Sequence, residues 1–135
     1  MIVPLLTYCG NLHIVLTKTQ KRKLASLEER YKNLIENTAV QPIEQRLLLR
    51  ACIYVKKCLN EKVCDDFKNY FKLIKHQKNT RNNNFILRLP PAKLAFFRKS
   101  FAFAGAKIYN ELPIDLRLES SLNDFKVKAK QHFRF

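Results

Sequence analysis

The stretch RKSFAFAGAKIYNELP, residues 98–113, combines two structural periods. Phe101 and Phe103 alternate with small residues, which is the spacing of an extended strand. From residue 104 onward the apolar positions recur three and four residues apart, which predicts a helix. Pro113 cannot continue a helix, so we expect that helix to stop before it. Gly105 at the change of period indicates a close approach of the chain or a backbone conformation that a side chain would forbid.

Helix-start signals recur on both sides of this stretch. Thr17 and Gln20 form a capping pattern, Pro42 precedes a long amphipathic segment, and Ser120 or Ser121 precedes the last one. We therefore expect a mainly α fold, a small bundle of five or six helices. We also consider a short two-stranded ribbon near 85–89 and 100–104. Residues 1–78 and 79–135 form two regions of what we expect to be one structural unit.

The composition is that of a packed, strongly basic protein. Of 135 residues 47% are hydrophobic and only two are glycine, and the formal net charge is +15. Such a charge concerns partners more than fold, and it favours nucleic acid or another polyanion. From Phe67 to Asn110 there is no acidic residue. This segment is most stable when an external anion screens it, although surface lysines can also cluster by chance.

The candidate phosphate contacts are lysines and arginines on the second helix, in the acid-free segment and before Ser100. Phe96 and Phe97, next to the last of them, have the chemistry to stack on an exposed base, but aromatic residues are more often part of the core. The candidate residues are Lys18, Lys21, Arg22, Lys23, Lys68, Lys72, Lys75, Lys78, Arg81, Arg98 and Lys99.

No residue pattern indicates catalysis, and we expect no catalytic residue, metal site or cofactor. Two glycines far apart cannot form a phosphate-binding loop. The adjacent carboxylates Asp65 and Asp66 precede an aromatic segment, where they favour a helix N-terminus over a metal site. The four cysteines lack the Cys-x-x-Cys spacing of a zinc knuckle, so we expect reduced, buried thiols.

The apolar run Ile2–Tyr8 is too short for a signal peptide or a membrane span. We therefore expect no membrane partner. We expect an intracellular location, in the nucleus or the cytoplasm. The oligomeric state stays open.

The stretch 98–113, followed by SLNDFK at 121–126, resembles the C-terminal end of reverse transcriptases of non-LTR retrotransposons, the jockey-like elements and their relatives. Many chains of that family end in a KSF-x-(F/Y)-x-GAK-(L/I)-(W/Y)-N-x-LP pattern and then SL-x-x-FK. The segment Ile2–Tyr8 is similar to the one that follows the polymerase palm, and residues 17–30 to the helix after it.

The resemblance implies a fragment of an RNA-directed DNA polymerase. Residues 1–78 would be a helical thumb-like region and 79–135 a C-terminal tail. The metal-binding aspartates of that family lie upstream, in the palm, and nothing here matches them, so the chain would not be an enzyme on its own. The implied partners are RNA or an RNA–DNA hybrid and the palm domain of a parent polymerase. The alternative is a protein-interaction or scaffold fragment without a nucleic-acid role.

Overall fold

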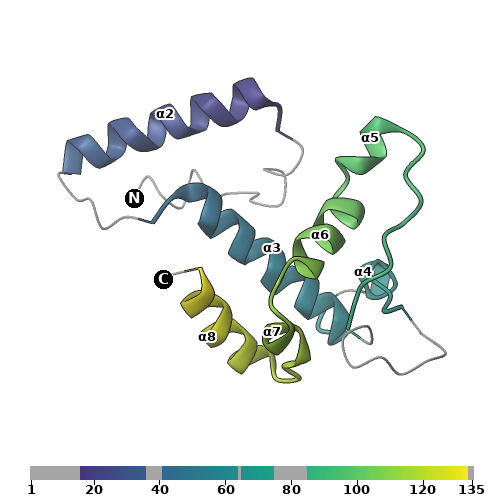
Figure 1. The fold of residues 1–135 in the computed structure, drawn as a ribbon. Helices are drawn as coiled ribbons and strands as arrows, with labels where there is room; N and C mark the ends of the chain where they lie inside the picture. Colours follow the sequence, from purple (N-terminus) through teal and green to yellow (C-terminus); the bar gives the residue numbers. More distant parts are fainter. Residues whose placement is uncertain (1–15, 36–40, 64, 75–84, 134–135) are drawn as a thin grey trace.

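The computed structural model describes residues 16–35, 41–63, 65–74 and 85–133. They form five helices of five residues or more and two single-turn helices (Figure 1). The predicted mainly helical bundle is therefore confirmed. The longer helices are α2 (Lys18–Ile35), α3 (Ile43–Leu59), α6 (Phe101–Asn110), α7 (Ile114–Leu118) and α8 (Leu122–His132), and the single turns are α4 (Asp65–Lys68) and α5 (Ala95–Arg98).

The central helix is α3, which packs against α6 and α8 (Figure 1). Val55 of α3, Tyr109 of α6 and Phe125 of α8 meet there, each at most 1% exposed. The Tyr109 and Phe125 rings are stacked, with centroids 6.3 Å apart. Burial of such side chains removes apolar area from water, which is the main force that holds a bundle together. The long amphipathic segment predicted after Pro42 is confirmed as α3, and its apolar face is buried at Ile43, Leu47, Ala51, Val55 and Cys58.

The predicted ribbon between residues 85–89 and 100–104 is wrong, because α6 already begins at Phe101. Ser100 caps this helix, since its hydroxyl accepts a hydrogen bond from the Phe103 amide at 3.4 Å. The segment in which phenylalanine and alanine alternate is therefore helical. The Phe101 ring packs against the rings of Tyr54 and Phe71, which lie far away in sequence. A Cβ at Gly105 would lie 3.3 Å from the rings of both Phe101 and Phe71. Gly105 therefore permits a close approach of two rings, as one of the two expectations had it.

Residues 71–74 pair instead with residues 86–88. The Ile74 amide donates to the Ile86 carbonyl and the Arg88 amide to the Lys72 carbonyl, each at 2.8 Å, in an isolated antiparallel bridge. The helix expected after Asp65 is therefore only one turn long.

On the side away from residues 71–74, the backbone of Leu87 forms hydrogen bonds with the side chain of Asn110. The amide of Leu87 donates to Asn110 Oδ1 at 2.8 Å, and the Leu87 carbonyl accepts from Asn110 Nδ2 at 2.9 Å. Leu87 is fully buried, so both of its backbone polar groups require partners. Asn110 supplies them from the end of α6 and thereby attaches the paired segments to the bundle.

The helix ends follow the predicted signals. α6 ends at Asn110, three residues before Pro113. Ser121 is the N-cap of α8 and accepts from the Asp124 amide at 3.4 Å. At α2 the Thr17 hydroxyl accepts from the Gln20 amide at 3.3 Å, and Gln20 Oε1 accepts from the Thr17 amide at 2.9 Å. This is the reciprocal capping box that the sequence predicts.

Candidate nucleic-acid interface

The first two turns of α2 carry four of the predicted phosphate contacts. Lys18, Arg22 and Lys23 are exposed, and Lys21 is partly covered. The first turn contains no acidic side chain. The positive end of the helix dipole therefore adds to these charges, where a carboxylate would have offset it. The start of α2 therefore carries positive charge that no carboxylate of its first turn offsets.

A second basic group consists of Lys72 and Arg88. The two residues are neighbours because the backbone pairing of 71–74 with 86–88 places them opposite each other, and both side chains are exposed. They border an open groove of about 1020 Å³ at the C-terminal end of α3. Its other lining residues are Cys58, Leu59, Glu61, Asn69, Phe71, Leu73 and Ile74.

A third group lies at α5, where Arg98 and Lys99 are exposed. The Arg98 Nε atom donates to the Ala92 carbonyl at 3.4 Å. Beside them is an apolar cavity of about 350 Å³, which we call the aromatic pocket. It is lined by Phe67, Tyr70, Pro90, Phe97, Ser100, Phe101 and Ala102.

The second and third groups belong to one part of the molecule. The two paired segments connect them, because Tyr70 and Pro90 line the aromatic pocket while Lys72 and Arg88 line the groove. The α2 group lies elsewhere: Lys21 shares a small cavity with the first residues of α3. With 17 residues, α3 separates its two ends by about 25 Å at the usual rise per residue.

Not every predicted contact is placed by the structure. Lys75, Lys78 and Arg81 lie outside the described residues, and so does the side chain of Lys68. Arg88 is a cation of the acid-free segment that is not among the residues expected to contact phosphate. The signal for Arg88 is its position between Leu87 and Leu89. Successive side chains of an extended segment point to opposite sides, so a buried Leu87 turns the Arg88 side chain outward.

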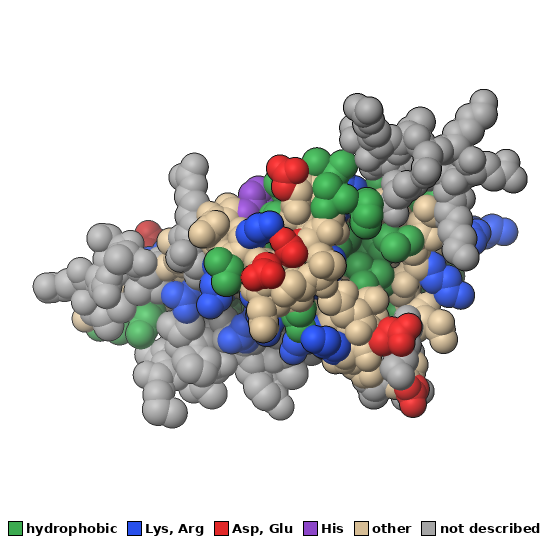
Figure 2. Space-filling model, turned by 90° about the horizontal axis from the view of Figure 1, so that it is seen from below, with side chains coloured by type: hydrophobic (Ala, Val, Ile, Leu, Met, Phe, Trp, Pro, Cys, Tyr) green, Lys and Arg blue, Asp and Glu red, His purple; other side chains and the backbone are tan. Residues whose placement is uncertain are grey.

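The fold also brings an acidic neighbour to the basic groove. Glu61, which precedes the acid-free segment, lines the groove together with Lys72 and Arg88. On the face shown in Figure 2, acidic side chains likewise lie among the basic ones. Residues 67–110 contain no carboxylate, but the fold places carboxylates from other parts of the chain close to some of their basic side chains.

A buried lysine is the unexpected polar residue of the core. Lys56 of α3 is 6% exposed. Its Nζ atom donates to the Arg117 carbonyl at 3.4 Å and to the Tyr109 hydroxyl at 3.5 Å, and it lies 5.5 Å from the centre of the Phe125 ring. Burial lowers the pKa of Lys56, and the nearby Glu119 carboxylate raises it in part. Burial also raises the pKa of Tyr109 to about 12.

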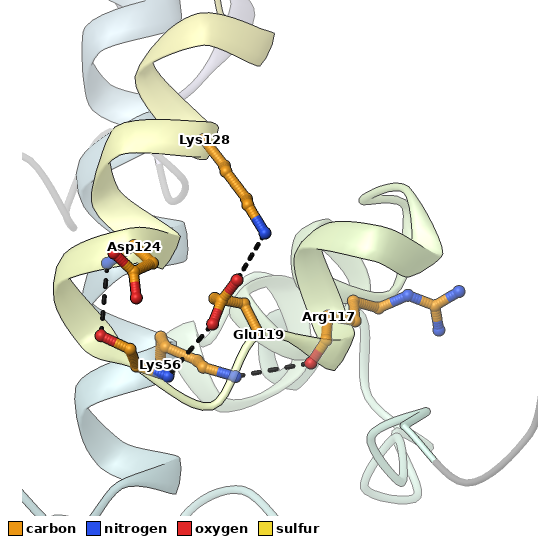
Figure 3. A network of polar contacts seen from close by, with 6 residues as sticks. Lys56, Arg117, Glu119, Asp124 and Lys128 are labelled. Atoms are coloured by element: carbon orange, nitrogen blue, oxygen red, sulfur yellow. Dashed lines mark hydrogen bonds and ion pairs between the residues drawn. The ribbon is translucent and has the colours of Figure 1, made fainter.

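Figure 3 shows how the surrounding polar groups are connected. Glu119 accepts a hydrogen bond from Lys128 of α8 at 2.5 Å and another from the Ser121 amide at 3.4 Å. The hydrogen bond from Lys128 lowers the pKa of the Glu119 carboxyl, and the same contact raises the pKa of Lys128. The cluster therefore joins α3, α7 and α8.

A lysine with a lowered pKa is also what nucleophilic catalysis requires. The Lys56 ammonium, however, is directed at a carbonyl and a phenol inside the core, and it lines neither the groove, nor the aromatic pocket, nor the small cavity at Lys21. Its contacts are those of a structural residue. The sequence signal that could have marked it is helical spacing, because Lys56 lies seven residues after Leu49 and four after Cys52, on the buried face of α3.

Within the described ranges, no group of three or more histidine, cysteine, aspartate or glutamate side chains is placed to hold a metal ion. The thiols of Cys52 and Cys58 are reduced and buried, as expected, whereas Cys9 and Cys64 lie outside the described residues. No helix among the described residues has the length and apolar character needed to span a membrane. No family model, curated protein or solved structure matches this chain.

Proposed function

We propose that this chain binds RNA or an RNA–DNA hybrid through its phosphates, as the non-catalytic C-terminal region of a non-LTR retrotransposon reverse transcriptase. The origin is supported by the sequence resemblance at residues 98–113 and 121–126. The binding is supported chiefly by one observation, the side-by-side position of Lys72 and Arg88 on an open groove. Two adjacent cations can contact successive phosphates, which gives affinity with little base preference.

The decisive measurement is the salt dependence of binding to a fluorescent RNA–DNA hybrid. The logarithm of the affinity should fall linearly with the logarithm of the salt concentration, because bound phosphates release their counter-ions. A double variant, Lys72→Gln with Arg88→Gln, should bind more weakly and reduce the slope by about one unit for each lost contact. Affinity that does not change with salt would overturn the proposal.

The matched control removes two other exposed cations, Lys107→Gln with Lys130→Gln. Both double variants lower the net charge equally, and Lys107 of α6 and Lys130 of α8 line neither the groove nor the aromatic pocket. The control should retain the wild-type slope. Equal losses in the two variants would mean that net charge alone attracts the nucleic acid.

A scaffold role is the second candidate, and one observation favours it. Leu27 and Leu34 of α2 are 50% and 80% exposed, although they form the apolar stripe of an amphipathic helix. An uncovered stripe of this kind is a place where another helix can pack. A defined oligomer in sedimentation, together with no shift of RNA mobility, would favour this function over nucleic-acid binding.

A further inference from the structure

The aromatic pocket is a second feature of the same part of the surface. Tyr70 and Phe97 are 49% and 39% exposed at its edge. The Tyr70 ring lies 5.3 Å from the ring of Phe67, tilted by 47°, so it is held in place by a neighbour. Large aromatic side chains that remain exposed around a cavity commonly mark a binding site.

The surroundings of the pocket favour an anionic ligand. Arg98 and Lys99 follow Phe97 directly and are exposed. Lys72 and Arg88 stand two residues from Tyr70 and Pro90, which line the pocket. Every lining residue belongs to the segment without aspartate or glutamate, and the nearest carboxylates in sequence are Asp65 and Asp66 at the start of α4.

We propose that the aromatic pocket holds one unpaired base of a single-stranded nucleic acid, stacked against Tyr70 and Phe97. Arg98 and Lys99 contact the adjoining phosphates. This inference rests on the proposed nucleic-acid binding and adds the strand type to it. Bases in a duplex are stacked on one another, so only an unpaired base has free faces to offer to an aromatic side chain.

The lining also indicates what the pocket does not select. Ser100 and Tyr70 supply its polar side chains, and the Ser100 hydroxyl already accepts a hydrogen bond from the Phe103 amide. Few hydrogen bonds are therefore available to read the edge of a base. Stacking itself depends little on sequence, so the pocket should accept any base, with purines and pyrimidines differing only in stacking strength.

The test compares three labelled ligands of equal length: single-stranded oligo(dT), a single strand of abasic sites, and a DNA duplex. The abasic strand has the phosphates of oligo(dT) without its bases. Wild-type protein should bind oligo(dT) more tightly than the abasic strand, by roughly fivefold to a hundredfold for one stacked base. Its affinity for the duplex, whose bases are paired, should not depend on the aromatic pocket.

Tyr70→Leu should remove most of the difference between oligo(dT) and the abasic strand while the salt dependence remains. Tyr31→Leu on α2 is the matched control and should leave the difference unchanged, because Tyr31 does not line the pocket. If Tyr70→Leu does not fold by circular dichroism, Phe97→Leu takes its place in the same comparison.

The outcomes separate this inference from the function on which it rests. Equal wild-type affinity for oligo(dT) and the abasic strand overturns the base pocket and leaves phosphate binding intact. An equal loss of affinity for the duplex and for oligo(dT) in Tyr70→Leu also overturns the pocket. No binding to any of the three ligands, together with no binding to the RNA–DNA hybrid, overturns both proposals. Displacement of oligo(dT) by an uncharged apolar peptide would assign the pocket to a protein partner and would overturn the inference.

Discussion

Helices α8 and α2 are both amphipathic, and each begins at a hydroxyl cap, yet only α8 has its apolar face covered. Leu122, Phe125 and Ala129 of α8 are buried against α3 and the chain around it. On α2, by contrast, Leu34 is 80% exposed, and no residue whose exposure is described there is buried. The two helices have similar amphipathic sequences, but only α8 packs against the core helix α3.

The difference teaches that stability and candidate function reside in separate parts of this molecule. The helices α3, α6 and α8 hold most of the fully buried residues, and Leu87 is the one that the paired segments add. The described cations proposed to bind phosphate and the exposed rings lie on α2 and on or directly beside α5 and the paired segments. Substitutions in the first part should change the free energy of unfolding, and those in the second should change binding.

The largest effect on stability should come from truncating a buried side chain of α8. Phe125→Ala removes a ring that is 0% exposed and should lower the free energy of unfolding by about 3–5 kcal/mol. Leu34→Ala on α2 should change it by less than about 0.5 kcal/mol, since its side chain is already in water. Urea denaturation followed by circular dichroism measures both, and similar losses would show that α2 is packed as well as α8.

The next effect tests how the paired segments are attached to the core. Asn110→Ala leaves the buried amide and carbonyl of Leu87 without their hydrogen-bond partner. We expect a loss of about 2–3 kcal/mol in the free energy of unfolding. Asn123→Ala, at an exposed position of α8, is the control and should be nearly neutral. A small loss at Asn110 would mean that water can reach Leu87.

A pH dependence should arise in the core through Cys52. Burial raises the pKa of the Cys52 thiol from 9.0 to about 12. Between these values the folded protein retains a proton that the unfolded chain has lost, so stability falls as pH rises from about 9 to about 12. At pH 10 the loss from this group is about 1 kcal/mol relative to pH 7.

Two other core groups titrate in the same range, so a variant is needed to isolate Cys52. The pKa of Tyr109, raised by burial from 10.0 to about 12, acts in the same direction above pH 10. The lowered pKa of Lys56 acts oppositely, since stability rises with pH between that pKa and 10.5. Cys52→Ala should be less stable at pH 7 yet lose about 1 kcal/mol less between pH 7 and pH 10. An unchanged loss in the variant would mean that the thiol is not buried in solution.

The local part of this fold could be predicted from the sequence, and the long-range part could not. The caps at Thr17 and Ser121 and the stop before Pro113 depend on residues a few positions apart. The start of α6 at Phe101 also has a local signal, the cap at Ser100, which the alternation of Phe101 and Phe103 with alanine obscures. By contrast, the contact of Phe71 with Gly105 could not be predicted, because Phe71 is far away in sequence. Likewise, composition indicated basic residues, but the pairing of 71–74 with 86–88 decides that Lys72 meets Arg88.

The smallest expected effect compares the two caps directly. Ser121→Ala removes the cap of a packed helix and should lower the free energy of global unfolding by about 1 kcal/mol. Thr17→Ala removes a similar cap from α2, and we expect little change in global unfolding, because a helix without a buried face can open while the core stays folded. Hydrogen exchange should detect the loss as roughly fivefold faster exchange of the α2 amides. If both variants shift the urea midpoint equally, α2 unfolds together with the core, and its exposed leucines belong to the cooperative fold in spite of their contact with water.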